Sequence, residues 1–354
     1  MSNRHYSIVV LPGDGIGREV VAEAERVMDA AASKFGFSVS TESFDWSCEH
    51  FATHGQMMPG DALDTLAGFD AILLGAVGYP GVPDHVSLWG MLIPIRRRFR
   101  QYVNLRPVKL YEGVVSPLAG RNPGDIDYLI VRENNEGEYS EIGGRLNRDT
   151  PDEMCVQESV FTAKGCDGVI DYAFRLAQTR PRKQVTSATK SNGTVHTMPF
   201  WDERFAAVSE RYPDIDTQQF HIDILAAHFV QHPDWFDVVV GSNLFGDILS
   251  DLGPATCGSI GIAPGANLNP EKEHPSMFEP VHGSAPDIAG QGIANPVGQI
   301  LSMGMMLDHL GETEAAAAVE SAVAETLKDP ALRTRDLGGQ AMTEEAGMAV
   351  AERV

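Results

Sequence analysis

Cysteine is scarce in this chain, and the spacing of the few cysteines argues against a structural role. Among 354 residues there are four, at Cys48, Cys155, Cys166 and Cys257. None forms a CxxC pair, and no pair of histidines completes a zinc-binding pattern. A chain of this length buries roughly three quarters of the surface that its unfolded form exposes, so it needs no disulfide or structural zinc to fold. We therefore expect buried or semi-buried free thiols in a protein of the reducing cytoplasm.

Basic residues and long apolar runs are also scarce. Lysine and arginine number 27 against 49 aspartates and glutamates, a net charge of −22. Such a surface repels phosphates, so nucleic acid and anionic membranes are excluded as expected partners. No stretch approaches the roughly 20 apolar residues of a membrane span, and the polar segment 1–6 lacks the apolar core of a signal peptide.

Short apolar runs alternate with helical patterns along the chain. Runs rich in Val, Ile and Leu, typical of strands covered on both faces, lie at 7–11, 71–74, 128–131, 185–188 and 238–240. After the first run, apolar residues recur at helical spacing between Val20 and Ala31. This alternation predicts an α/β fold with helices on both sides of a sheet. The length predicts about two domains.

A glycine-rich turn follows the first predicted strand. Its sequence, Gly13-Asp-Gly-Ile-Gly17, stands between a strand and a helix, as in a dinucleotide-binding loop. The third glycine comes one residue too early for GxGxxG, however, and no well-placed acid follows about 20 residues later. A tight turn that leads into a helix is the better interpretation.

Arginine is concentrated in one part of this acidic chain. Five arginines occupy positions 96, 97, 98, 100 and 106, and Arg132 follows a predicted strand. A planar guanidinium binds a carboxylate through two parallel hydrogen bonds, so converging arginines suit a dicarboxylate. For Arg97, Arg98 and Arg100 we favour a solvated helix face paired with acids. Arg106, held extended by the proline that follows it, and Arg132, at a strand end where α/β sheets place ligands, are the better site candidates.

Two aspartates four residues apart form a candidate metal site. Asp247 and Asp251 would lie on one face of a helix, where like charges repel unless a cation binds between them. Oxygen ligands favour Mg²⁺ or Mn²⁺. The pattern is common by itself, but it follows a predicted strand and turn, and Asp223 is a candidate third ligand. Lys190 is a candidate base and Tyr139 a candidate acid, although each is by default a surface residue.

The long stretch from Ala263 to Pro296 is rich in glycine and proline. It contains two histidines, four carboxylates and three asparagines in one segment. A passive loop is rarely this long, so we expect the segment to be functional.

Five segments together resemble the β-decarboxylating hydroxyacid dehydrogenases, the family of the isocitrate and isopropylmalate enzymes. They read LPGDGIGREV (11–20), NLRPV (104–108), VRENNEGEYSEIGG (131–144), SNLFGDILSDL (242–252) and EPVHGSAPDIAGQGIANP (279–296). They span nearly the whole chain. The resemblance implies a two-domain α/β fold with a large mixed sheet flanked by helices, which is not a Rossmann fold. It divides the chain into a larger cofactor-binding domain, 1–103 with 256–354, and a smaller domain, 104–255, that carries the dimer interface.

Within the family the chain most resembles the tartrate and D-malate dehydrogenase branch. The segments FDWSCEHF (44–51), DHVSLWG (84–90) and the run Asn134–Glu138 indicate this. Isopropylmalate enzymes usually carry a glutamate and small apolar residues near Trp89, and isocitrate enzymes a serine and an asparagine that are missing here.

The resemblance also implies a site. Arg96, Arg106 and Arg132 would bind substrate carboxylates, and Asp223, Asp247 and Asp251 would hold Mn²⁺ or Mg²⁺. Lys190 would act in base chemistry with Asp223 close by, and Tyr139 would act as the acid. Lys190 and Asp223 would come from the other subunit of a homodimer.

A further set of residues would bind NAD. The set comprises Gly75, Ala76, Val77, Glu279, His282, Gly283, Ser284, Ala285, Asp287, Ile288 and Asn295. Asp287 would face the ribose hydroxyls and repel a 2′-phosphate, which favours NAD over NADP.

The expected activity is oxidation of a 2-hydroxy dicarboxylic acid, D-malate or tartrate, with or without loss of CO₂. A monovalent cation such as K⁺ is a possible further cofactor. The alternatives are a 3-isopropylmalate dehydrogenase and, in another class, a non-catalytic regulatory subunit, which would be expected to lose site residues that are present here.

Overall fold

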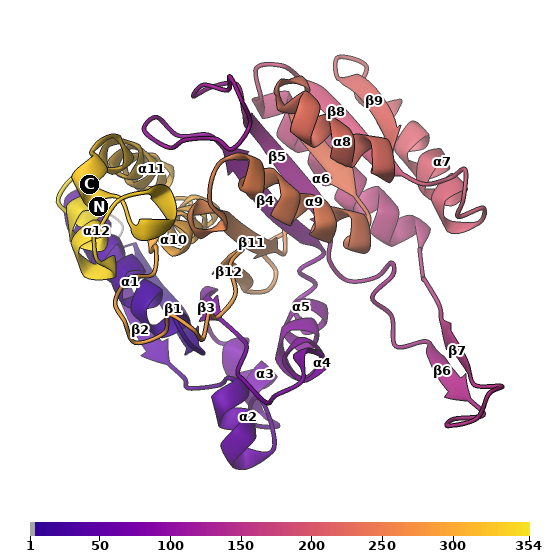
Figure 1. The fold of residues 1–354 in the computed structure, drawn as a ribbon, viewed down its shortest axis with the longest axis horizontal. Helices are drawn as coiled ribbons and strands as arrows, with labels where there is room; N and C mark the ends of the chain where they lie inside the picture. The colour runs from indigo at the N-terminus through magenta and orange to yellow at the C-terminus, as the bar shows by residue number, and fades with distance from the viewer. Residues whose placement is uncertain (1–3) are drawn as a thin grey trace.

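A computed structural model describes residues 4–354 as one large mixed sheet flanked by helices, with a separate two-stranded arm (Figure 1). The strands are β1 (His5–Gly13), β2 (Ser38–Ser43), β3 (Ala71–Ala76), β4 (Val103–Lys109), β5 (Asp127–Glu133), β6 (Gly143–Leu146), β7 (Met154–Gln157), β8 (Gln184–Thr189), β9 (Asp216–His221), β10 (Val238–Gly241), β11 (Pro264–Leu268) and β12 (Ser276–Pro280).

The helices alternate with these strands. They are α1 (Gly17–Phe35), α2 (Cys48–His54), α3 (Ala62–Leu66), α4 (Asp84–Ser87), α5 (Ile93–Arg98), α6 (Ala163–Thr179), α7 (Thr197–Ser209), α8 (Ile222–Gln231), α9 (Asn243–Thr256), α10 (Val297–Leu310), α11 (Thr313–Lys328) and α12 (Thr343–Ala351). A single π-helical turn, Leu88–Leu92, joins α4 to α5. No helix of the described residues is long and apolar enough to cross a membrane.

The large sheet has ten strands in the order β2-β1-β3-β12-β11-β4-β5-β10-β8-β9. The sheet has two wings of parallel strands, β2-β1-β3-β12 on one side and β5-β10-β8-β9 on the other. Between them, β11 and β4 run antiparallel to their neighbours. The predicted strands are all present, and all six residues of β3 and all four of β10 are buried, as strands covered on both faces require. The predicted α/β class is confirmed.

Helices cover the two wings separately. Helices α1, α10, α11 and α12 pack together beside β1 and β3, whereas α6 packs with α7, and α8 with α9, over the other wing. The sheet runs without interruption through the expected domain boundary, because β4 begins at Val103 and pairs with β11 from the C-terminal part. The division into two domains stays a prediction.

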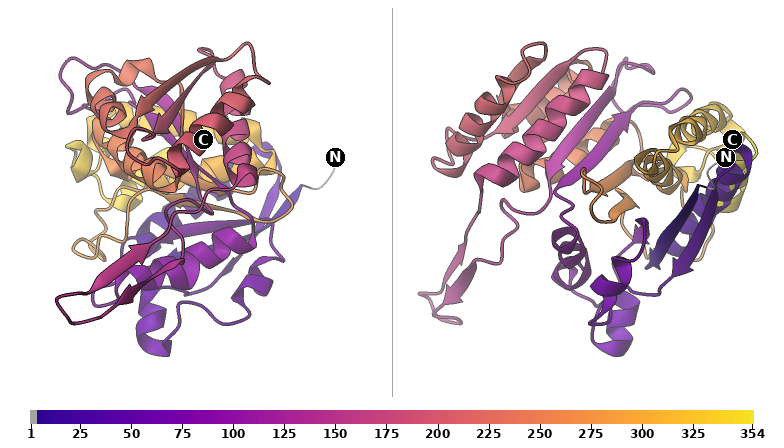
Figure 2. Two further views of the ribbon diagram at one scale, coloured as in Figure 1. Left: turned by 90° about the vertical axis from the view of Figure 1, so that its right-hand side faces the viewer. Right: turned by 180° about the vertical axis from the view of Figure 1, so that it is seen from behind.

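An arm of two strands, β6 and β7, projects away from the body (Figures 1 and 2). All eight of its strand residues are exposed. Among the neighbouring exposed apolar side chains, Ile142 and Leu146 are each 58% accessible. Within residues 4–354 nothing covers these strands. An isolated two-stranded sheet with this much apolar surface is marginal in water.

Candidate active site

The three arginines expected to bind carboxylates are buried together at the centre of the sheet. Arg106 lies on β4 and Arg132 on β5, while Arg96 lies on α5. Their residues are 7%, 3% and 6% exposed, respectively. Burial lowers the pKa of Arg106 to about 10, and the neighbouring Arg132 and Arg96 add to that shift while Glu279 opposes it. The three guanidinium groups therefore share one site.

Strand register explains this convergence. Asn104 pairs with Arg132 across β4 and β5, and with Asn267 across β4 and β11, so the three side chains share one face. Arg106 lies two residues after Asn104 and therefore points to the same face. Glu279 lies on β12 and accepts a hydrogen bond from Arg96 Nη2 at 2.9 Å.

Two asparagine side chains connect Arg106 to Glu279, and sequence reasoning did not identify them. Arg106 Nε donates to Asn104 Oδ1 at 2.8 Å, and Asn104 Nδ2 donates to Asn267 Oδ1 at 2.9 Å. Asn267 in turn donates to Glu279 Oε1 at 2.7 Å. Each of these asparagines is fully buried. The signal was present in the segment NLRPV, where Asn104 stands two residues before Arg106, the period of one strand face.

A second chain of contacts links Arg132 to Tyr139. Arg132 pairs with Asp247 Oδ1, and its Nε and Nη2 donate to Asn243 Oδ1 at 3.1 and 2.7 Å. The Tyr139 hydroxyl donates to Asp247 Oδ2 at 2.6 Å, and its ring lies 5.5 Å from the Arg132 guanidinium carbon. Burial, with the hydrogen bond to Asp247, raises the pKa of Tyr139 to about 12. The tyrosine is therefore protonated at neutral pH, as an acid must be.

The candidate metal ligands fall into two separate groups. Asp247 and Asp251 lie one turn apart on α9, and burial and Asp247 raise the pKa of Asp251 while Arg106 lowers it. Asp223 lies in the first turn of α8 with its side chain 67% exposed, and it accepts a hydrogen bond from Lys190 Nζ at 2.8 Å. That hydrogen bond lowers the pKa of Asp223. In residues 4–354 no three His, Cys, Asp or Glu side chains of one chain are placed to hold a metal ion.

The residues expected to bind a nucleotide line two adjacent segments. Gly75 and Ala76 end β3, and His282–Asn295 follow β12. His282 is buried, and burial lowers its pKa, while its Nε2 atom has no hydrogen-bond partner among the residues that the structure describes. Asn295 Nδ2 donates to Asp336 Oδ2 at 2.9 Å. Asp336 was not identified from the sequence, because it stands far along the chain in a short 3₁₀ turn.

The expectations for the surface arginines and for the cysteines had different outcomes. Arg97, Arg98 and Arg100 pair with Glu141, Asp64 and Glu273 on the surface, as predicted. The expectation for cysteine is wrong at Cys155, which is exposed because it lies in the projecting arm; the other three are buried, and all four are free. The segment 263–296 is not a single loop, since it contains β11 and β12; its expected functional role stays a prediction.

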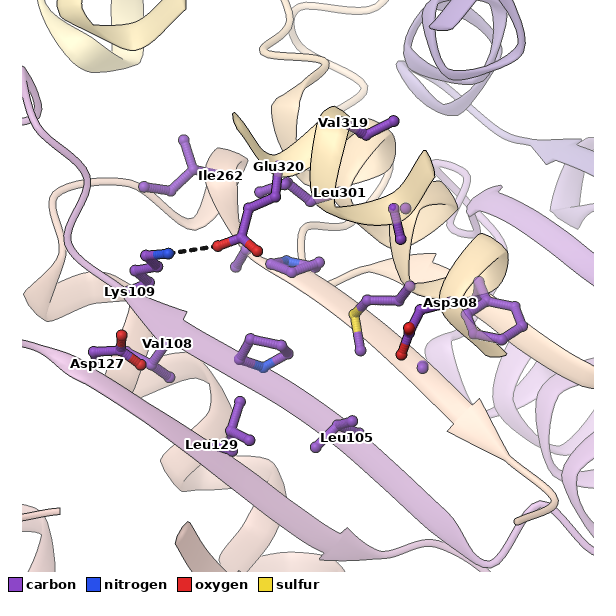
Figure 3. A pocket seen from close by; sticks show the side chains of 18 of the residues that line it. Leu105, Val108, Lys109, Asp127, Leu129, Ile262, Leu301, Asp308, Val319 and Glu320 are labelled. Carbon is purple, nitrogen blue, oxygen red and sulfur yellow. Dashed lines mark hydrogen bonds and ion pairs between the residues drawn. The ribbon is translucent and has the colours of Figure 1, made fainter. Parts of the chain in front are cut away.

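A cavity of about 560 Å³ lies on the opposite side of the sheet. Its lining includes Leu105 and Leu129, which alternate with the arginine-bearing positions, and the ion pair of Lys109 with Glu320 borders it (Figure 3). None of the expected site residues lines this cavity.

Comparisons with known proteins decide the family. The sequence profile described as isocitrate/isopropylmalate dehydrogenase matches residues 7–350. The chain belongs to this family.

Curated relatives within the isocitrate/isopropylmalate dehydrogenase family match over nearly their full length. They include D-malate dehydrogenase (decarboxylating) of Escherichia coli, 56% identical with 97% of each chain covered. The probable tartrate dehydrogenase/decarboxylase of Bacillus subtilis is 52% identical, covering 100% of this chain and 99% of the relative. The tartrate dehydrogenase/decarboxylase of Pseudomonas putida is 51% identical, covering 99% and 98%.

A solved structure of the family has the same fold. Isocitrate dehydrogenase from Methylococcus capsulatus superposes with a TM-score of 0.88 at 33% identity, covering 98% of this chain and 99% of that one. With relatives that are decarboxylating dehydrogenases, the chain is an oxidoreductase of this family.

Proposed function

We propose that this protein oxidises a small 2-hydroxy dicarboxylic acid, D-malate or tartrate, with NAD and a divalent cation, and that the β-carboxylate leaves as CO₂. The observation that carries the proposal is the group of three buried arginines on a chain of net charge −22. Arg96 and Arg132 have carboxylate partners in Glu279 and Asp247, whereas no salt bridge among the described residues involves Arg106. A buried cation without an anionic partner is costly unless an anionic ligand binds it. The names of the relatives support D-malate and tartrate as that ligand.

The arginines have donors to spare for two carboxylates. Among the described residues, Arg106 uses only Nε internally, which leaves both of its Nη groups for a substrate. Arg96 Nε is buried without a partner. Charge-assisted hydrogen bonds of this kind contribute roughly 1.5–3 kcal/mol each, so the arginines would fix both ends of a short dicarboxylate.

The carboxylates of α9 suit a hard divalent cation. Asp247 and Asp251 supply only oxygen donors, the preference of Mg²⁺ and Mn²⁺. Burial, and to a lesser extent repulsion by Asp247, raises the pKa of Asp251, and a bound cation would offset both effects. Asp223 of a second subunit would complete the set. When bound, the cation would acidify the C2 hydroxyl and stabilise the negative charge that forms as CO₂ leaves.

Two side chains would move the protons. Lys190 would accept the proton of the C2 hydroxyl; it is held by Asp223 and is only 31% exposed. Tyr139, protonated and aimed at Asp247, would return a proton to carbon after CO₂ is lost. Arg132 lies against the tyrosine ring and would keep it beside the substrate.

NAD fits the second group of residues. The unpartnered Nε2 of His282 is an unused polar atom of the kind that a bound adenosine would satisfy. Asp287 is exposed on the same loop, and its carboxylate would accept hydrogen bonds from ribose hydroxyls and repel a 2′-phosphate. NAD is therefore proposed over NADP.

A homodimer that shares its sites explains the separation of Lys190 and Asp223 from the α9 carboxylates. The exposed apolar residues Ile224 and Ile248 lie on α8 and α9, and Leu146 lies on the arm. Together they provide surface that a second copy would cover. The buried free thiols fit a reducing compartment, the cytoplasm.

A substrate panel tests the proposal. NAD reduction is followed with D-malate, L-tartrate and 3-isopropylmalate, in the presence of Mn²⁺ and K⁺ and again after chelation. Turnover of D-malate or tartrate that chelation abolishes is expected. Preference for 3-isopropylmalate would instead assign the alternative activity, and no turnover of any of them by a metal-loaded dimer would favour a regulatory subunit.

A further inference from the structure

The glycine-rich turn at residues 13–17 contacts both of the segments that are proposed to bind NAD. The backbone N–H of Asp14 donates to the Ala76 carbonyl at 2.7 Å, at the end of β3. Two residues later, the N–H of Ile16 donates to the Ser284 carbonyl at 2.9 Å, in the loop after β12. The turn therefore connects two segments that lie more than 200 residues apart in the sequence.

The glycines of this turn are required by backbone packing. A Cβ atom at Gly13 would lie 1.9 Å from the Ala76 oxygen, and one at Gly15 would lie 2.0 Å from the Ser284 oxygen. Both glycines also have positive φ, 72° and 57°. The motif thus fits closely against the nucleotide segments instead of forming a phosphate loop of its own.

Asp14 is the one charged side chain of the turn, and it is buried to 1% exposure. Its carboxylate accepts three backbone hydrogen bonds, from the N–H of Cys48 and Glu49 at 2.9 Å and from the N–H of Gly78 at 3.0 Å. No cation pairs with it among the described residues. A buried carboxylate is tolerated only when such donors replace its hydration, so these three N–H groups and Asp14 depend on each other.

We propose that Asp14 is a positioning residue for the dinucleotide, and this inference rests on the proposed function. By holding the N–H of Gly78, it fixes the turn 75–78 against the loop that carries Ser284. The two segments are already in contact, since a Cβ at Gly78 would lie 2.9 Å from Ser284 Oγ. Asp14 is 1% exposed, so its effect on the dinucleotide would be transmitted through the backbone groups that it holds.

The substitution Asp14→Asn tests this with little change of shape. Asp14 Oδ2 accepts from the N–H of Cys48 and Gly78, and Oδ1 accepts from the N–H of Glu49. A neutral amide has only one acceptor oxygen, so at least one attachment is lost and the hydrogen bonds that remain are weaker without the charge. We expect the Kd of NADH, measured by titration calorimetry without turnover, to rise about tenfold, which corresponds to about 1.4 kcal/mol. At saturating NAD, kcat and the KM of the hydroxy acid should stay within about threefold of wild type. The control is Asp29→Asn, an exposed aspartate on α1.

Several outcomes would overturn the inference. An NADH Kd within twofold of wild type would do so, as would a parallel loss of kcat, both KM values and melting temperature, which indicates a purely structural role. If Asp14→Asn does not fold, Gly78→Ala leaves the carboxylate intact while pushing the same turn away from Ser284, and it must weaken NADH binding. If the wild-type chain binds NADH but the variants bind it equally well, this inference alone fails; if wild type binds no NADH, the proposed function fails with it.

Discussion

Tyr139 and Asp247 are joined by a 2.6 Å hydrogen bond from the tyrosine hydroxyl to Oδ2, while Arg132 occupies the other oxygen of the same carboxylate. One aspartate therefore contacts the proposed acid and a proposed substrate arginine, and it is itself a proposed metal ligand. Because the three roles meet at one carboxylate, they can be separated by single substitutions at its neighbours.

Tyr139→Phe should affect the late part of the reaction. The ring and its contact with Arg132 remain, but the proton donor is lost. General acid catalysis contributes about 10²–10⁴-fold, so we expect steady-state turnover to fall by about 100-fold while the first turnover still forms NADH rapidly. Stopped-flow absorbance would detect that burst. Loss of NADH binding in this variant would contradict the assigned role.

Asp247→Asn should raise the cation requirement. An amide is a neutral and weaker ligand for a hard cation than a carboxylate is. We expect the Mn²⁺ concentration for half-maximal activity to rise at least about tenfold, against no change in Asp29→Asn. A metal titration that overlays the wild-type curve would reject Asp247 as a ligand.

Shared sites predict complementation between inactive subunits. At a Mn²⁺ concentration that saturates wild type but is too low to restore Asp247→Asn, the Lys190→Ala and Asp247→Asn homodimers are each expected to be inactive. When the two are mixed and allowed to exchange subunits, half of the dimers are mixed, and each of these regains one of its two sites. Activity should recover to about a quarter of wild type. If the mixture stays inactive although mixed dimers form, the site lies within one chain.

Glu133 gives stability a pH dependence. Burial raises its pKa to about 7, although the N–H groups of Asn135 and Glu136 oppose the shift. Between the ordinary pKa of a glutamate and about pH 7, Glu133 binds a proton in the folded chain but not in the unfolded chain. This proton binding stabilises the folded chain; the stabilisation is complete at acid pH and is lost as pH rises through 7.

Replacing Glu133 by glutamine should remove that contribution. Denaturant unfolding at pH 5 and pH 8 would measure it, with the exposed Glu210→Gln as control. The stability of Glu133→Gln relative to wild type should increase toward pH 8 by at least about 1 kcal/mol, since one pKa unit corresponds to about 1.4 kcal/mol. Equal pH dependence in wild type and Glu133→Gln would show that the carboxyl titrates normally.

Local sequence patterns determined the class of the fold and indicated several candidate site residues, whereas Arg96 and the NAD-binding set were proposed from the family resemblance. Buried strands such as β3 and β10 are continuous apolar runs, and Asp247 and Asp251 fall one helical turn apart. The surface position of Arg97, Arg98 and Arg100 also followed from the excess of acids around them. These features depend on neighbours within a few residues, which is the range that periodicity and charge can report.

Tertiary structure decided what no local pattern contains. Strand register, set by pairing across the sheet, brought Asn104, Asn267 and Arg132 to one face, and packing between distant segments gave Asp14 its three N–H partners. The turn Gly13–Gly17 does not match the dinucleotide-binding pattern. Its glycines are required instead by close contact with backbone atoms of Ala76 and Ser284, which lie far away in the chain. Such contacts form only when the strands assemble into the sheet, since each contact depends on the relative placement of segments that are separate in the unfolded chain.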